Sequence, residues 1–156
     1  MPLDSASLQS DLHSLFVSPP VVMDGDDVDY SASRQACAQA WADAMTGYAA
    51  AVVPPSTTIA AASFVLFVQL TTAFGTGSAA AAVDAAFQAW AASLGAGMAP
   101  GFVAVPPPSP PGFPSGLAAA QASHSAAAAY WAGLIDAWCR TGTATPAGGG
   151  APVLWA

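Results

Sequence analysis

The stretch that decides the fold is TTIAAASFVLFVQLTTAF, residues 57–74. Pro54-Pro55 stops the segment before it, and Gly75-Thr76-Gly77 breaks the chain after it. A helix that is apolar on nearly every face lies at the centre of a bundle or is shared with a neighbouring subunit, and we expect one of these positions here. The many β-branched and aromatic residues keep a strand open as the alternative.

Apolar residues recur at helical spacing on both sides of this stretch. Within residues 79–94, for example, Val83, Phe87, Trp90 and Leu94 form one stripe. The sequence therefore predicts a mainly α fold, a small helical bundle of four to five helices, in a single domain over residues 1–156. The other helices are expected over 5–17, 31–52 and 117–140, with Ser5, Ser56, Ser78 and Ser115 as candidate N-caps.

An aromatic and methionine stripe follows the helix expected over residues 31–52. Its members, at helical spacing, are Arg34, Cys37, Trp41, Met45 and Tyr48. Core packing is the interpretation we favour for this stripe, and a ligand groove is the alternative.

Residues 95–116 form a Pro/Gly-rich arm in which 12 of the 22 residues are Gly or Pro. This density predicts no regular helix or sheet, and polyproline II over Val105–Pro108. The segment is either an extended arm on an adjacent subunit, or a proline ligand for a reader domain, or a rigid linker packed on its own bundle.

The C-terminal tail, residues 141–156, is expected to be flexible or extended. A tryptophan after a glycine run and one residue from the end is costly to expose in a monomer, so Trp155 is predicted to dock on a partner. Together the arm and the tail supply six interface candidates: Phe102, Val103, Phe113, Val153, Leu154 and Trp155.

Charged residues make up only 7% of the chain, against about 25% in typical soluble domains. There is no Lys and no Glu, and the fixed cations are Arg34 and Arg140. A net charge of −7 opposes binding to nucleic acid and to anionic membranes. So few charges cannot cover the surface of a monomer, which predicts that protein partners bury much of it.

Four of the nine aspartates lie within six residues: Asp24, Asp26, Asp27 and Asp29. A calcium loop of the helix–loop–helix type needs oxygen ligands at positions 5 and 12, where this chain has Val28 and Gln35. We therefore expect a solvated turn whose acids favour the N-terminus of the next helix, with cation binding left open.

The remaining chemistry points away from an enzyme. Cys37 and Cys139 are too far apart for a metal motif, and they are either two buried thiols or a disulfide. His13 and His124 lack a nucleophile context, and no phosphate-binding loop is possible without lysine. No catalytic, cofactor-binding or metal-binding residue is expected.

Targeting signals are absent from the sequence. The start, MPLD, lacks the basic and apolar regions of a signal peptide, so we expect synthesis in the cytoplasm without export. The most apolar window, Ile59 to Phe74, has 16 residues, fewer than the roughly 20 that span a bilayer.

Four stretches of the chain resemble a class of small Ala- and Pro-rich proteins from tailed-phage and phage-tail-like particle gene clusters. The resemblance implies a virion or contractile-tail component, such as a neck, tail or baseplate element or a capsid decoration subunit, without active-site residues. The stretches are SDLHSLF (residues 10–16) with Pro19-Pro20, Ala40-Trp41 to Tyr48 with Pro54-Pro55-Ser56, Met98-Ala99-Pro100 with the proline run, and Ala132 to Trp138 with TGTATP (residues 141–146).

The expected function is thus that of a structural subunit in a phage or phage-like particle. Its partners would be other subunits of the particle, including copies of itself around a symmetry axis. An assembly chaperone or adaptor that shields a hydrophobic partner is the alternative, followed by a membrane-active helical hairpin.

Overall fold

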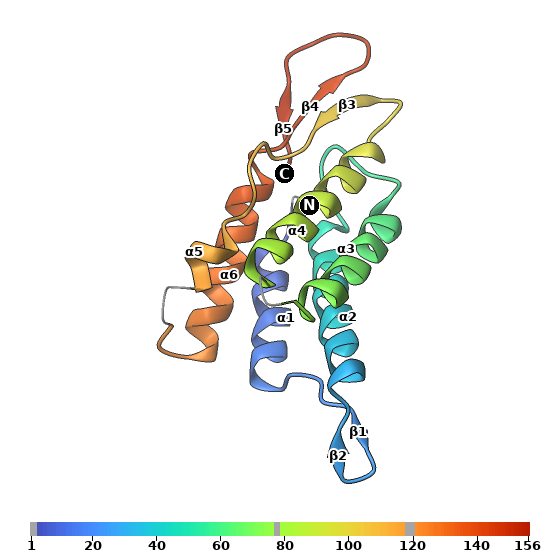
Figure 1. Cartoon of the computed structure of the whole chain (residues 1–156). Coiled ribbons are helices and arrows are strands. Elements are labelled where there is room, and N and C mark those ends of the chain that lie inside the picture. The colour runs from blue at the N-terminus through green and yellow to red at the C-terminus, as the bar shows by residue number, and fades with distance from the viewer. Residues whose placement is uncertain (1–2, 77–78, 118–120) are drawn as a thin grey trace.

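The computed structural model describes residues 3–76, 79–117 and 121–156 (Figure 1). The fold over these residues is mainly α, as predicted, with six helices instead of four to five, because a short helix, α5, precedes the last long one. The helices are α1 (Ser5–Val17), α2 (Tyr30–Ala49), α3 (Ile59–Ala73), α4 (Ala79–Ala96), α5 (Phe113–Leu117) and α6 (His124–Cys139). The strands are β1 (Met23–Asp24), β2 (Asp27–Val28), β3 (Phe102–Val105), β4 (Thr143–Pro146) and β5 (Val153–Leu154).

The five long helices pack in the spatial order α6, α1, α2, α3, α4. Small side chains allow close approach: Ala42 of α2 and Ala62 of α3 are fully buried, and the Ser63 hydroxyl donates to the Ala42 carbonyl at 3.2 Å. The bundle closes through aromatic rings, since Phe87 and Trp90 of α4 lie 6.3 and 6.4 Å, centroid to centroid, from Trp138 of α6.

Side chains outside the helices fix where they begin. Asp4 caps α1 by accepting from the Ser7 amide at 3.0 Å, so the cap is one residue before the predicted Ser5. Asp29 ends the acidic run and caps α2 by accepting from the Ala32 amide at 2.9 Å. The expected role of these acids at a helix N-terminus is therefore confirmed for Asp29, while Asp24 and Asp27 pair in the exposed β1–β2 hairpin.

The last long helix begins later than predicted. We expected a helix over 117–140 capped by Ser115, whereas α6 begins at His124 behind Ser123, whose hydroxyl accepts from the Ala126 amide at 3.1 Å. Ser115 lies inside α5 instead. The cap predicted at Ser78 lies outside the described residues. Ser56 does not cap α3 directly, because the N-cap residue is Thr58.

The prediction that residues 95–116 hold no regular structure was wrong. Residues 102–105 form β3, which pairs antiparallel with β4 in the register Val103↔Thr145. The strand forms because its four residues, FVAV, stand between Gly101 and the first proline of the run. The arm thus packs on its own chain, and buried Pro107 and Pro111 lead from β3 back to α5.

The C-terminal tail completes a three-stranded antiparallel sheet in the order β3–β4–β5. Its hairpin turns through Gly149 and Gly150, whose φ angles of 89° and 143° favour glycine. This sheet lies at one end of the bundle, and the β1–β2 hairpin lies at the other (Figure 1). Among the described helices, none is both long and apolar enough to cross a membrane.

Candidate functional site

The six predicted interface residues divide into two groups in the structure. Phe113 and Trp155 are buried in the core of their own chain, and Phe102 is half-buried against it. Val103, Val153 and Leu154 are exposed. The structure therefore leaves three of the six available to a partner, and two of the predicted anchors serve the chain itself.

Trp155 packs between two glycines rather than on another molecule. A Cβ atom at Gly142 would lie 2.7 Å from the indole, and one at Gly95 would lie 3.2 Å from it. The indole Nε1–H donates to the Thr143 carbonyl at 3.1 Å, which satisfies its polar atom. The backbones of Val53 and Ala156 exchange two hydrogen bonds, at 2.7 and 3.0 Å, and fix the chain end beside the bundle.

Phe113 is held in place by a buried carboxylate. Oδ1 of Asp84 accepts from the backbone amides of Gly112 and Phe113, at 3.0 and 2.9 Å. The Phe113 ring stacks on Trp131 at a centroid distance of 4.8 Å and lies 4.9 Å from Phe87. A proline-rich segment that lacks amides for helical pairing is thereby joined to α4.

One exposed apolar face lies on α3. Ala62, Leu66, Leu70 and Ala73 point into the bundle and are buried, so the helical prediction is confirmed and the strand alternative is excluded. The opposite side, which we call the α3 outer face, carries Ala61, Phe64 and Val68, and 65% of Phe64 is exposed. Residues 57–74 predicted a helix that is either central to the bundle or shared with a neighbouring subunit, and α3 packs against α2 and α4 while this side stays exposed.

A second exposed apolar face lies on the sheet. Val103 pairs with Thr145, and Val105 pairs with Thr143, which pairs in turn with Leu154. Because directly paired residues project to the same side, Val103, Val105 and Leu154 share one surface, the sheet outer face. The exposed fractions of Val103 and Leu154 are 64% and 62%.

These two faces are free of formal charge. Between Asp43 and His124 the sequence contains one acidic or basic side chain, Asp84, which is buried. After Asp136 it contains one more, Arg140, which is paired with Asp136 at 2.8 Å. The charge of the molecule is therefore concentrated on α1, the β1–β2 hairpin and α2.

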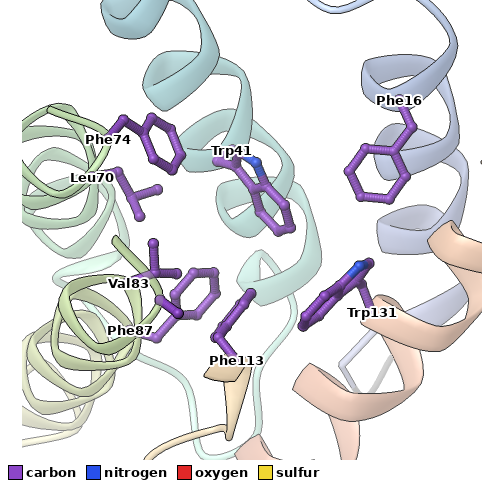
Figure 2. Close-up of a pocket in the computed structure, with 9 residues that line it drawn as sticks. Phe16, Trp41, Leu70, Phe74, Val83, Phe87, Phe113 and Trp131 are labelled. Carbon is purple, nitrogen blue, oxygen red and sulfur yellow. The ribbon is translucent and has the colours of Figure 1, made fainter. Parts of the chain in front are cut away.

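An apolar cavity lies inside the bundle, with a volume of about 210 Å³ (Figure 2). Figure 2 shows rings from separate elements around it: Phe16 of α1, Trp41 of α2, Phe113 of α5 and Trp131 of α6. The rest of the lining is Leu70, Phe74, Ala80, Val83 and Phe87. The cavity could not be predicted from the sequence, because the residues that line it come from six helices and one loop and follow no regular spacing along the chain.

A groove of about 520 Å³ adjoins this cavity and lies between α1 and α2. Phe16, Trp41 and Phe74 line both the cavity and the groove. Arg34 and Cys37 line the groove but not the cavity. The aromatic and methionine stripe predicted over residues 31–52 lies on α2 and has two roles. Met45 and Tyr48 are buried core residues, while Arg34, Cys37 and Trp41 face the groove.

Cys37, Cys139 and His13 lie in different parts of the structure: Cys37 lines the groove, Cys139 is buried and His13 lies on the surface. Cys37 and Cys139 are free thiols, so no disulfide joins them, and burial raises the pKa of both. His13 lines a shallow depression with Ser10 and Ser125, and no hydrogen bond links these three side chains. Within the same residues, no group of three His, Cys, Asp or Glu side chains is placed to hold a metal ion.

Comparisons with known proteins give no relative for this chain: no family model matches the sequence, and neither a curated protein nor a solved structure is similar to it.

Proposed function

We propose that this protein is a structural subunit of a bacteriophage virion or phage-tail-like particle, and that it acts by burying apolar surface against neighbouring subunits. The observation that carries the proposal is the exposure of large apolar side chains on two faces without charge. Phe64 and Val68 form the centre of one face, and Val103, Val105 and Leu154 form the other.

The energetics of these faces favour an assembled state. Fully burying a Val, Leu or Phe side chain contributes roughly 1.5–3 kcal/mol, so five such residues offset a substantial part of the cost of association. In a chain with so few charges, no favourable interaction compensates for leaving these apolar side chains in water. Paired or repeated subunits are the arrangement that uses both faces at once.

Charge supports contact between copies through these faces. Each copy carries a net charge of −7, so contact through the aspartates of the β1–β2 hairpin would bring like charges together. The α3 outer face and the sheet outer face contain no ionised side chain, and contact there avoids this repulsion. The resemblance of the sequence to phage and phage-tail-like components supports the same assignment.

Finished particles provide the test. We expect the protein to co-purify with them at a fixed ratio to the other subunits, as quantified by mass spectrometry. Phe64→Gln and Val68→Gln, combined, should reduce incorporation several-fold without lowering the melting temperature, because both side chains are exposed in the free chain. Val21→Gln, at an exposed valine outside both faces, is the matched control and should be incorporated like the native chain.

The alternative function gives a different result in the same experiment. An assembly chaperone or adaptor would be abundant in the lysate and absent from finished particles. That outcome, or a chain that stays monomeric at millimolar concentration and never enters particles, would refute the proposal.

A further inference from the structure

The cavity of Figure 2 has the size and lining of a site for an apolar group. Its volume is about 210 Å³, and enclosed apolar cavities of about 150 Å³ in other proteins bind benzene-sized molecules. Water inside it would find few polar partners, because the lining side chains are aromatic or aliphatic, with only the indole N–H groups of Trp41 and Trp131 as donors. An apolar ligand would regain the dispersion contacts that the empty space lacks.

The exit from the cavity constrains the shape of the ligand. Phe16, Trp41 and Phe74 line both the cavity and the groove, so a molecule that occupies both must pass these three rings. A flexible chain can adapt its shape to such a path.

Among the described residues, Arg34 is the one formally charged side chain that lines the groove. Arg34 lines the groove and is exposed, and it makes no ion pair in the described part of the chain, whereas the other cation, Arg140, is bound to Asp136. Arg34 and Trp41 are seven residues apart on α2, which corresponds to about 10 Å along the helix axis. The apolar and the cationic parts of the space are thus separated by about the length of a medium acyl chain.

We propose that this protein binds a medium-chain fatty acid, with the acyl tail in the aromatic cavity and the carboxylate at Arg34. The site is distinct from the α3 outer face, because Leu70 reaches the cavity from the buried side of α3. Fatty-acid binding therefore does not depend on the structural role proposed above.

Titration of the purified full chain with decanoate, below its micellar concentration, tests this proposal by calorimetry and by NMR of the tryptophan indoles. The Nε1–H signals of Trp41 and Trp131 should shift on binding. The signal of Trp155 should not, since that indole is buried beside Gly142 at the sheet. Octanoate should bind more weakly, by about fourfold for each methylene removed.

Two substitutions that fill the cavity locate the tail. Ala80→Phe and Val83→Phe place a ring in the space that the acyl chain would occupy, and each should weaken decanoate binding at least tenfold. Ala81→Phe makes the same change one residue along α4 at an exposed position, and it should leave the affinity as it is. Circular dichroism identifies which of the two cavity-filling variants are folded. One folded variant is enough for the binding test.

Replacing the cation locates the head group. Arg34→Gln should weaken decanoate binding about two- to fivefold, the range for an exposed ion pair, and should leave binding of neutral decanol unchanged. Absence of decanoate binding would overturn the proposal. So would equal affinity in the folded filling variants, or equal losses for decanol and decanoate in Arg34→Gln.

Discussion

The phenolic hydroxyl of Tyr48 donates a 2.9 Å hydrogen bond to Oδ1 of Asp136 and so joins α2 to α6 across 88 residues of sequence. Oδ2 of the same aspartate accepts from Nε of Arg140 at 2.8 Å. Arg140 in turn donates from Nη2 to the Leu3 carbonyl at 3.3 Å. One carboxylate thus links two helices and the segment before α1.

Removing the phenolic hydroxyl should destabilise the fold. In Tyr48→Phe, Asp136 loses one of two partners but keeps Arg140, so we expect the free energy of unfolding to fall by about 1–2 kcal/mol. Urea denaturation followed by circular dichroism measures this change. Tyr30→Phe is the control, because Tyr30 is exposed and should change the stability by less than about 0.5 kcal/mol. Equal effects in the two variants would contradict a structural role for the Tyr48–Asp136 bond.

Stability should fall at alkaline pH in two steps. Burial raises the pKa of Cys139 and of Tyr48, and the neighbouring Asp136 raises the pKa of Tyr48 further. The folded chain then keeps protons that the unfolded chain loses above about pH 8.5 for a thiol and about pH 10 for a phenol. Stability is therefore fully present below these values and decreases above them, by up to about 1.4 kcal/mol per pH unit for each group.

The two steps can be separated by substitution. In a Cys37→Ala background, which removes the other thiol whose pKa is raised, Cys139→Ala should shift the onset of the loss from about pH 8.5 to about pH 10. Urea denaturation across pH 7–11 measures the slope. An unchanged onset in the Cys139→Ala variant would show that this thiol does not contribute.

Asp84 should be sensitive to substitution because it is buried and accepts two backbone hydrogen bonds. Asp84→Ala leaves the amides of Gly112 and Phe113 without their acceptor in a buried site, at an expected cost of about 2–4 kcal/mol. Asp84→Asn retains an acceptor oxygen and should cost less than half as much. Asp43→Ala, at an exposed residue bonded to Gln39, is the control and should be nearly neutral. A neutral Asp84→Ala would mean that the proline-rich segment does not need this anchor.

Substitution by alanine should change the stability in opposite directions at Gly133, within α6, and at Gly142, after it. At Gly142 a Cβ atom would approach the Trp155 ring at 2.7 Å, so Gly142→Ala must displace the ring and should destabilise by about 1–3 kcal/mol. At Gly133 a Cβ atom meets nothing within 4 Å, so Gly133→Ala should stabilise the helix by about 0.5–1 kcal/mol. Thermal unfolding of the two variants distinguishes these signs directly.

The sequence predicted the helices well because their signal is local. The apolar spacing gave α1 over residues 5–17 with the bounds that the structure has, and α4 from its first residue. The α3 outer face was only partly predictable, since a helix with apolar residues on every side can lie at the centre of a bundle or be shared with a neighbour.

The sheet and the cavity were not predictable in the same way. The four residues of β3 find their partner β4 some 40 residues further along the chain, and the prolines around them gave the opposite local signal. Gly95 and Gly142 make the space for the Trp155 ring. Two glycines so far apart in the sequence form no periodic pattern that would predict this space. Long-range packing, which a local pattern does not encode, decided these features.

Trp155 offers the sharpest contrast between the sequence prediction and the structure. As a docking anchor for a partner, it could be replaced without loss of stability in the isolated chain. As the buried residue observed here, Trp155→Ala should lower the free energy of unfolding by about 3–5 kcal/mol, a large share of the total for a domain of this size. Leu154→Ala removes an exposed neighbour on the sheet outer face, and it should change the stability by less than about 0.5 kcal/mol while weakening any contact made there. Urea denaturation of both variants decides between the two roles, because only a core residue gives the large loss in the absence of a partner.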